Sequence, residues 1–149
     1  MNNERRPAKG DLIGFYGTLM RGLGGLEALG VSAGLRFVGP CICIGTLHDL
    51  GAYPGLLRTL DRETDARVVG ELFAIVDPRI TEALDEFEGV VPGRPDESLY
   101  LREYVDLIEP RDSRAWLYVY NQPLPGPDAE ASRIKGGDWR AHIAPLARK

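Results

Sequence analysis

One segment of the chain combines a strand pattern with a helix pattern, and it limits the possible folds more than any other part of the sequence. Residues 67–76 (RVVGELFAIV) are mostly apolar and β-branched, which predicts a buried strand. Asp77 is then a good helix N-cap, Pro78 suits the first helical position, and Gly89 supplies a C-terminal stop. Within this helix, the apolar residues predicted to face the core recur at helical spacing: Ile80, Leu84 and Phe87.

The remainder of the sequence predicts short strands separated by turns. The 149 residues include 18 Gly and 11 Pro, which interrupt regular structure at short intervals. Strand patterns recur at residues 11–19, 36–50, 100–109 and 114–121. Residues 123–149 predict mostly loop with a short closing segment. Regular strand–helix alternation is missing, so the pattern favours an α+β protein, a small mixed β-barrel flanked by a few short helices, over a doubly wound sheet. We expect a flexible tail over residues 1–10 and a single domain over residues 11–149.

Composition and charge exclude several functional classes. Apolar residues make up 44% of the chain, as expected of a globular protein, and no apolar run approaches the roughly 20 residues of a membrane span. The net charge is −4 and no basic run occurs, so we expect no nucleic-acid partner and no membrane partner. The polar N-terminus is not followed by the apolar region of an export signal, which predicts a cytoplasmic protein.

The cysteine pattern does not indicate a metal centre. Cys41 and Cys43 lie two residues apart, so a strand would point both thiols to the same face. A disulfide between such close neighbours would be strained, and zinc needs four ligands where only His48 and Asp49 lie near. We therefore predict packed thiols and no metal site.

Glu88 is the acidic residue of the predicted helix that lies nearest its apolar face. On a helical wheel, Glu82 and Asp85 fall roughly opposite the apolar centre and Glu86 lies to the side, so these three are expected to face water. Three effects would raise the pKa of Glu88: the helix C-terminus, the like charge of Asp85 at i−3, and partial burial. A carboxylate shifted toward neutral pH is a usable general base. The alternative is an ordinary solvated residue at the flank of an amphipathic helix.

A glycine-rich turn follows the first predicted strand, in residues 15–25 (FYGTLMRGLGG). Gly17 and Gly22 have the spacing of a phosphate loop, but Leu23-Gly24 stand where that motif needs Gly-Lys. The dinucleotide pattern fails as well, because Glu27 replaces its last glycine. The backbone N–H groups freed at such a turn can still bind a carboxylate or a carbonyl oxygen.

Taken in order, the short motifs of this chain resemble one family. They are YGTL (16–19), GTLHDLGAYPGLL (45–57), VVGELFAI (68–75), LDEFEGV (84–90), YLREYVDL (100–107), AWLYVYN (115–121) and GGDW (136–139). Together they are similar to the gamma-glutamylcyclotransferase-like superfamily, over about residues 12–139. The resemblance implies a small β-barrel with flanking helices and a pocket at the YGTL turn. It also implies that Glu88 is the catalytic acid/base and that the residues of the turn line the pocket: Tyr16, Gly17, Thr18 and Leu19.

The resemblance further implies a reaction. Glu88 would take a proton from the α-amino group of a small gamma-glutamyl substrate, and the freed amine would attack the γ-carbonyl of the same molecule. The products are 5-oxoproline and a free amine or amino acid. No metal or other cofactor is expected, because an intramolecular attack mainly requires orientation. The oligomeric state is left open between monomer and homodimer.

Further aromatic and basic residues are candidates near the pocket. Tyr120 could reach the substrate with its hydroxyl, and core packing of its ring is the alternative. Arg102 could pair with a substrate carboxylate, although an ion pair within the protein, with Asp106 as the expected partner, is favoured. Tyr53 either borders the pocket or covers the edge of the core.

Two other functions remain possible on the same fold. One is a non-catalytic small-molecule-binding or interaction module, and the other is a tailoring enzyme that removes a gamma-glutamyl group from an acylated natural product. The leaving group of the substrate is not determined by the sequence.

Overall fold

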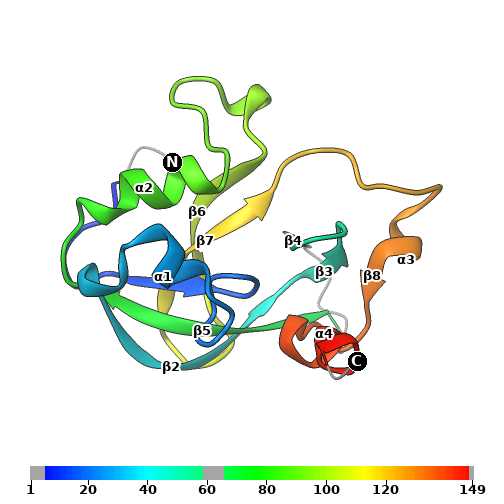
Figure 1. Ribbon diagram of the computed structural model, residues 1–149, viewed down its shortest axis with the longest axis horizontal. Coiled ribbons are helices and arrows are strands. Elements are labelled where there is room, and N and C mark those ends of the chain that lie inside the picture. Colours follow the sequence, from blue (N-terminus) through cyan, green and yellow to red (C-terminus); the bar gives the residue numbers. More distant parts are fainter. Residues whose placement is uncertain (1–5, 59–65, 148–149) are drawn as a thin grey trace.

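The computed structural model describes residues 6–58 and 66–147 and shows an α+β protein with two sheets (Figure 1). The larger sheet has the strand order β2-β5-β1-β7-β6, with bounds β1 (Leu12–Phe15), β2 (Leu35–Ile44), β5 (Arg67–Ile75), β6 (Tyr100–Asp106) and β7 (Arg114–Tyr120). The smaller sheet has the order β4-β3-β8, with bounds β3 (Thr46–Asp49), β4 (Pro54–Leu57) and β8 (Arg133–Ile134). The helices are short: α1 (Gly25–Leu29), α2 (Ile80–Phe87), α3 (Ala129–Ser132), α4 (Trp139–Ala147) and the 3₁₀ turns η2 (Ser32–Gly34) and η3 (Pro95–Glu97).

Strand β1 lies at the centre of the larger sheet. It pairs antiparallel with β5, where Phe15 lies opposite Glu71, and parallel with β7, where Ile13 lies opposite Trp116. The sheet curls so that its two edges meet at one bridge, between Ile42 of β2 and Glu109 beyond β6. The predicted α+β class is confirmed, but a single bridge does not close the sheet into a complete barrel.

Buried side chains lie on both faces of this sheet, because successive strand residues point to opposite sides: Ile13 and Trp116 lie on one face and Leu72 lies on the other. The fully buried members of the core are mostly aliphatic and aromatic, and include Ile13, Leu47, Leu56, Leu72, Ile75, Leu84 and Trp116. Cys41 and Cys43 are buried, free thiols, and burial raises the pKa of each to about 12. Thiols with such pKa values remain protonated and behave as small apolar groups.

Two predicted features of α2 need correction. The helix begins at Ile80 rather than at Pro78, because Asp77 and Pro78 form a preceding turn in which the Asp77 carboxylate accepts the N–H of Arg79 at 3.0 Å. Leu84 is fully buried as predicted, but Phe87 is 48% exposed and does not belong to the core. Phe87 is the last helical residue and borders the cavity described below, so its ring is left partly open to solvent.

The N-terminal segment is only partly described. Residues 1–5 of the predicted tail lie outside the described residues, and Gly10 is bonded through its N–H to the carbonyl of Ile75 at 2.8 Å. Among the described helices, none has the length and hydropathy of a membrane span.

Candidate active site

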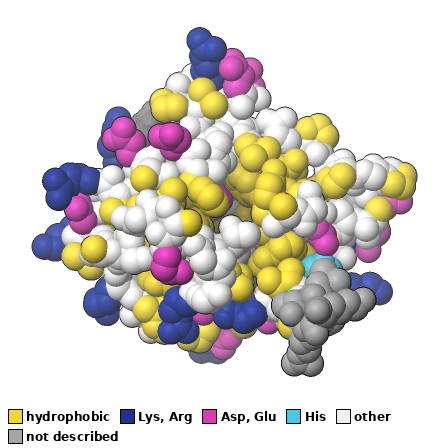
Figure 2. Space-filling view, viewed as in Figure 1, with side chains coloured by type: hydrophobic (Ala, Val, Ile, Leu, Met, Phe, Trp, Pro, Cys, Tyr) yellow, Lys and Arg dark blue, Asp and Glu magenta, His cyan; other side chains and the backbone are white. Residues whose placement is uncertain are grey.

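A cavity of about 620 Å³ opens between α1, α2 and the ends of β1, β4, β6 and β7. Figure 2 shows hydrophobic side chains gathered on this face, over β4 and the end of β7. The described residues that line the cavity are mainly glycines, aliphatic residues and aromatic residues, in the segments 14–19, 23–25, 53–54, 87–88 and 99–100 and at Tyr118. Among them Glu88 is the one charged side chain.

Glu88 owes its position to the way α2 ends. It is the C-cap residue, and Gly89 follows with a φ of +72°. The N–H of Gly89 donates to the carbonyl of Glu86 at 3.1 Å, and the N–H of Val90 donates to that of Asp85 at 2.9 Å. This pair of bonds is a Schellman motif, which turns the chain away from the helix axis. The stop predicted at Gly89 is therefore present, and it leaves the Glu88 side chain at the cavity.

The surroundings of Glu88 make its carboxyl unusually basic. Burial raises its pKa from an ordinary 4.5 to about 7, and the nearby negative charge of Asp85 adds to the rise. Both causes and the direction agree with the expectation from the sequence. Glu88 is thus poised to gain and lose a proton near neutral pH, as a general acid/base requires.

Asp85 does not face water, contrary to the expectation from the helical wheel. It accepts a hydrogen bond from the Tyr118 hydroxyl at 2.7 Å and forms an ion pair with Arg102. Arg102 and Tyr118 lie directly opposite each other on β6 and β7, so their side chains share the face of the sheet that α2 covers. Arg102 therefore forms an ion pair within the protein, as predicted, but its partner is Asp85 and not Asp106.

The expected partner of Arg102 is engaged elsewhere. Asp106 pairs with Arg114 at 3.0 Å, near the far end of the β6–β7 hairpin. Helical spacing alone could not show which strand residues would meet Asp85, because that depends on how α2 packs on the sheet.

The YGTL turn forms the wall of the cavity at the end of β1. The Tyr16 ring lines the cavity, but its hydroxyl donates to the carbonyl of Tyr118 at 2.5 Å and accepts the N–H of Leu56 at 3.1 Å. Gly17 packs so closely on Pro54 that a Cβ there would lie 2.8 Å from the proline ring. Within the described part of the chain, the backbone N–H groups of Gly17, Thr18 and Leu19 have no protein acceptor. These groups are available to a ligand oxygen.

Three buried tyrosines that line the cavity lie within the electrostatic influence of Glu88. Burial raises the pKa of Tyr16, Tyr100 and Tyr118 above the usual value, and the negative charge of Glu88 contributes to each rise. All three hydroxyls therefore stay protonated, and the Tyr100 hydroxyl donates to the carbonyl of Pro54 at 2.6 Å. Tyr100 and Tyr118 were not identified from the sequence, although their alternation in the two strands was visible.

The other predicted candidates lie at the edge of the site. Tyr53 borders the cavity, one of the two alternatives left open for it. Tyr120 is not among the described lining residues; its ring packs against Tyr100 with centroids 5.4 Å apart, and its hydroxyl lies 3.4 Å from the carbonyl of Pro123. Within the described residues, no group of three His, Cys, Asp or Glu side chains is arranged to hold a metal ion.

Comparisons with known proteins agree with this architecture. Several solved structures have the same fold. One is an uncharacterized protein from Pyrococcus horikoshii, with 20% identity, a TM-score of 0.63, and coverage of 93% of this chain and 97% of that one. Another is a protein specific to uropathogenic E. coli, with 20% identity, a TM-score of 0.65, and coverage of 91% and 97%. An AIG2-like protein from Mus musculus has 25% identity, a TM-score of 0.60, and coverage of 79% and 82%.

The family comparison covers most of the sequence. No curated protein matches the chain. The family model described as "Gamma-glutamyl cyclotransferase, AIG2-like" matches residues 13–141. These residues include the YGTL turn, Glu88 and all the described strands, apart from Leu12 at the start of β1. The chain therefore belongs to the AIG2-like gamma-glutamyl cyclotransferase family.

Proposed function

We propose that this protein converts a gamma-glutamyl group to 5-oxoproline and releases an amine or amino acid, with Glu88 as general acid/base. The observation that carries the proposal is the position of Glu88. A carboxyl with a pKa raised to about 7 lines the same cavity as a turn whose three N–H groups have no acceptor among the described residues. Family membership supports a cyclotransferase-type enzyme.

The proposed reaction needs one proton carrier. Ionised Glu88 takes a proton from the substrate's α-amino group, and the amine nitrogen forms a bond to the γ-carbonyl carbon. The resulting tetrahedral intermediate breaks its bond to the leaving nitrogen, which receives the proton from Glu88. The carboxylate is regenerated, and no water is consumed. Because attack occurs within one molecule, holding the amine close to the carbonyl supplies much of the rate increase.

The other walls of the cavity have proposed binding roles. The N–H groups of Gly17, Thr18 and Leu19 bind a substrate oxygen, and the ring of Tyr16 packs beside it. Tyr120 stays a proposed substrate contact for the outer part of the ligand, because its ring lies behind Tyr100. We also retain the predictions of a cytoplasmic location, a monomer or homodimer, and a reaction without cofactor.

The test compares Glu88→Gln with the native protein on a panel of γ-L-glutamyl amides, amino acids and peptides. Release of 5-oxoproline and of the amine are measured together. Gln is isosteric with Glu but cannot accept the proton, so we expect turnover to fall at least about 100-fold, the usual contribution of general acid–base catalysis. Glu86→Gln, an exposed change two residues earlier on α2, is the matched control and should retain native turnover.

Two results would contradict the proposal. Near-native turnover by Glu88→Gln would remove the assigned role of this residue. Binding of γ-glutamyl compounds without any 5-oxoproline from the native protein would instead indicate a binding module on the same fold.

A further inference from the structure

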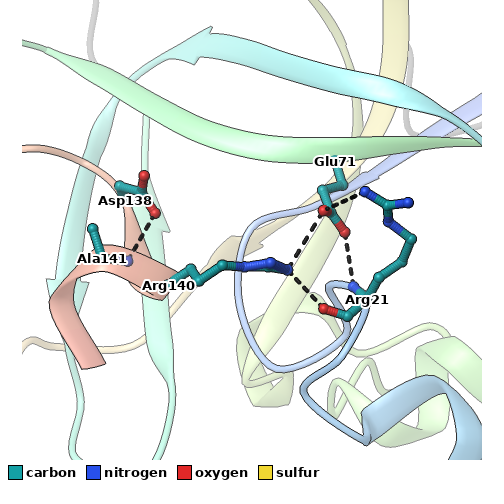
Figure 3. A network of polar contacts seen from close by, with 5 residues as sticks. All are labelled: Arg21, Glu71, Asp138, Arg140 and Ala141. Carbon is teal, nitrogen blue, oxygen red and sulfur yellow. Dashed lines mark hydrogen bonds and ion pairs between the residues drawn. The ribbon is translucent and has the colours of Figure 1, made fainter. Parts of the chain in front are cut away.

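The YGTL turn continues to Arg21, which belongs to a network of polar contacts with two distant parts of the chain (Figure 3). Residues 16–21 are called the cavity turn below. The carboxylate of Glu71, on β5, accepts the backbone N–H of Arg21 at 2.7 Å through Oε1. Its Oε2 lies 3.3 Å from Nη2 of Arg21 and 3.4 Å from Nη2 of Arg140, on α4. The same Arg140 nitrogen donates to the backbone carbonyl of Arg21 at 2.7 Å. Both backbone polar groups of Arg21 are therefore held by side chains from other elements.

The members of this network are themselves fixed in place. Glu71 lies opposite Phe15 in the sheet, and its side chain is only 12% exposed. Arg140 lies in the first turn of α4, where the Asp138 carboxylate accepts the N–H of Ala141 at 3.1 Å. The arginine side chains are about half exposed, but hydrogen bonds in which one partner is ionised are stronger than those between neutral groups. The network is thus suited to holding a backbone position rather than to covering a surface.

The opposite end of the turn is also anchored. The Tyr16 hydroxyl joins β7 to β4 through Tyr118 and Leu56, and the turn closes with the N–H of Met20 bonded to the carbonyl of Gly17 at 3.0 Å. The N–H groups of residues 17–19, which have no acceptor among the described residues, lie between these two anchors. Their directions therefore depend on both ends, since a short turn changes its dihedral angles when either end moves.

The cavity offers few other partners for a substrate carboxylate. Among the described lining residues there is no Lys, Arg or His, and Glu88 is negative when it acts as a base. A γ-glutamyl substrate carries its α-carboxylate already in the ground state. Successive backbone N–H groups form a concave anion site of the kind that suits such a group.

We propose that Glu71 and Arg140 are positioning residues that hold the N–H groups of residues 17–19 in the orientation that binds the substrate's α-carboxylate. This inference rests on the proposed function. It assigns the turn to ground-state binding of the substrate and separates that task from the proton transfer at Glu88.

The test uses Arg140→Ala and Glu71→Gln, with Arg114→Ala as the matched control. Arg140 and Arg114 are both 43% exposed and both pair with a carboxylate, but Arg114 lies on β7 away from the turn. We expect KM for a γ-L-glutamyl amide to rise about tenfold in Arg140→Ala and in Glu71→Gln, with kcat and the acid limb of the pH profile unchanged. Arg140→Lys should recover part of the loss, because an ammonium can still reach the Arg21 carbonyl.

A second measurement does not depend on turnover. Amide hydrogen exchange at Met20 and Arg21 should become at least about tenfold faster in Arg140→Ala and Glu71→Gln, and should stay native in Arg114→Ala. If the native protein shows no turnover on any γ-glutamyl compound, the proposed function fails while the exchange data still report on the turn.

Three results would overturn the inference. Native exchange rates in both Arg140→Ala and Glu71→Gln would show that the turn keeps its shape without these two side chains. An unchanged KM would show that the substrate's carboxylate does not bind there. A fall in kcat at constant KM would assign the turn to the transition state instead.

Discussion

Among single residues, Glu88 and Asp85 show how a fold can make one carboxyl basic while its neighbour on the same helix stays paired. Asp85 is paired with Arg102 and accepts a hydrogen bond from the hydroxyl of Tyr118, whereas burial and the charge of Asp85 are what act on the carboxyl of Glu88. The charge on Asp85 still adds to the rise in the pKa of Glu88, after burial.

The pH dependence of catalysis should follow from this arrangement. A base must be ionised to act, so kcat/KM should fall on acidification with an apparent pKa of about 7. Asp85→Asn removes the like charge and leaves Arg102 unneutralised, and both changes favour ionised Glu88, so the acid limb should move to lower pH. The measurement is a pH–rate profile, with Glu82→Gln on the exposed side of α2 as control. A limb that stays in place would exclude coupling between Asp85 and Glu88.

The partly buried carboxyl of Glu88 should lower the free energy of unfolding at and above neutral pH. The folded state binds the Glu88 proton more tightly than the unfolded chain does, so the stability that this group contributes is full below pH 4.5 and is lost as the pH rises through about 7. Glu88→Gln cannot ionise, so it should exceed the native protein in free energy of unfolding by about 3 kcal/mol near pH 8. Near pH 4.5 the two should be similar. Urea unfolding at both pH values measures the difference, and equal stability near pH 8 would contradict the assigned environment.

At the scale of elements, the end of α2 matters more to the site than its beginning. The start differs from the predicted position by two residues without consequence for the cavity, as helix boundaries often do. The end determines where Glu88 points, because the Schellman motif depends on the left-handed conformation of Gly89.

Gly89→Ala should therefore affect both stability and activity. A left-handed alanine costs about 1–2 kcal/mol, and its Cβ would also lie 2.9 Å from Cβ of Leu99 on the adjacent loop. We expect a loss of about 3 kcal/mol in the free energy of unfolding and a reduced kcat, because Glu88 must move when the contact is relieved. Gly93→Ala is a matched control: its φ of +73° is nearly the same, but nothing lies within 4 Å of the added carbon. Equal losses for the two variants would show that the contact with Leu99 has no effect.

The C-terminal helix α4 is an element that the sequence pattern did not reveal. Residues 123–149 were predicted as mostly loop, yet Trp139–Ala147 is helical. Pro145 and the absence of a regular apolar stripe hide the helix from pattern analysis. Its buried Trp139 and the bond from Arg140 to the cavity turn come from tertiary packing, which stabilises short helices that have weak local signals.

At the scale of the whole molecule, tyrosine hydroxyls join the two sheets beside the cavity. Tyr16 bonds to Tyr118 of the larger sheet and to Leu56 of the smaller one, and Tyr100 bonds from the larger sheet to Pro54. The wall formed by β4 is therefore held to the rest of the cavity by side chains whose rings also line it.

Tyr16→Phe should weaken this junction. The change removes the acceptor of the buried Leu56 N–H and the hydroxyl that donates to the Tyr118 carbonyl, which should cost about 2–3 kcal/mol in the free energy of unfolding. Tyr120→Phe is the control, because among the described residues its hydroxyl has one long, exposed contact, whose loss should cost about 0.5 kcal/mol or less. Urea denaturation of both variants checks the difference. A similar small cost for Tyr16→Phe would show that the hydroxyl does not join the sheets.

The sequence alone was sufficient for the α+β class, the buried strand β5, the stop at Gly89 and the choice of Glu88 and the YGTL turn as candidates. Each of these depends on local signals, such as alternation, helical spacing or a glycine, that act over a few residues. The tertiary structure alone decided that Asp85 meets Arg102 and Tyr118, that Phe87 lies at the open edge of the cavity, and that Glu71 and Arg140 hold the turn. Those contacts join residues up to 119 positions apart, and they depend on how strands and helices pack, which no short stretch of sequence encodes.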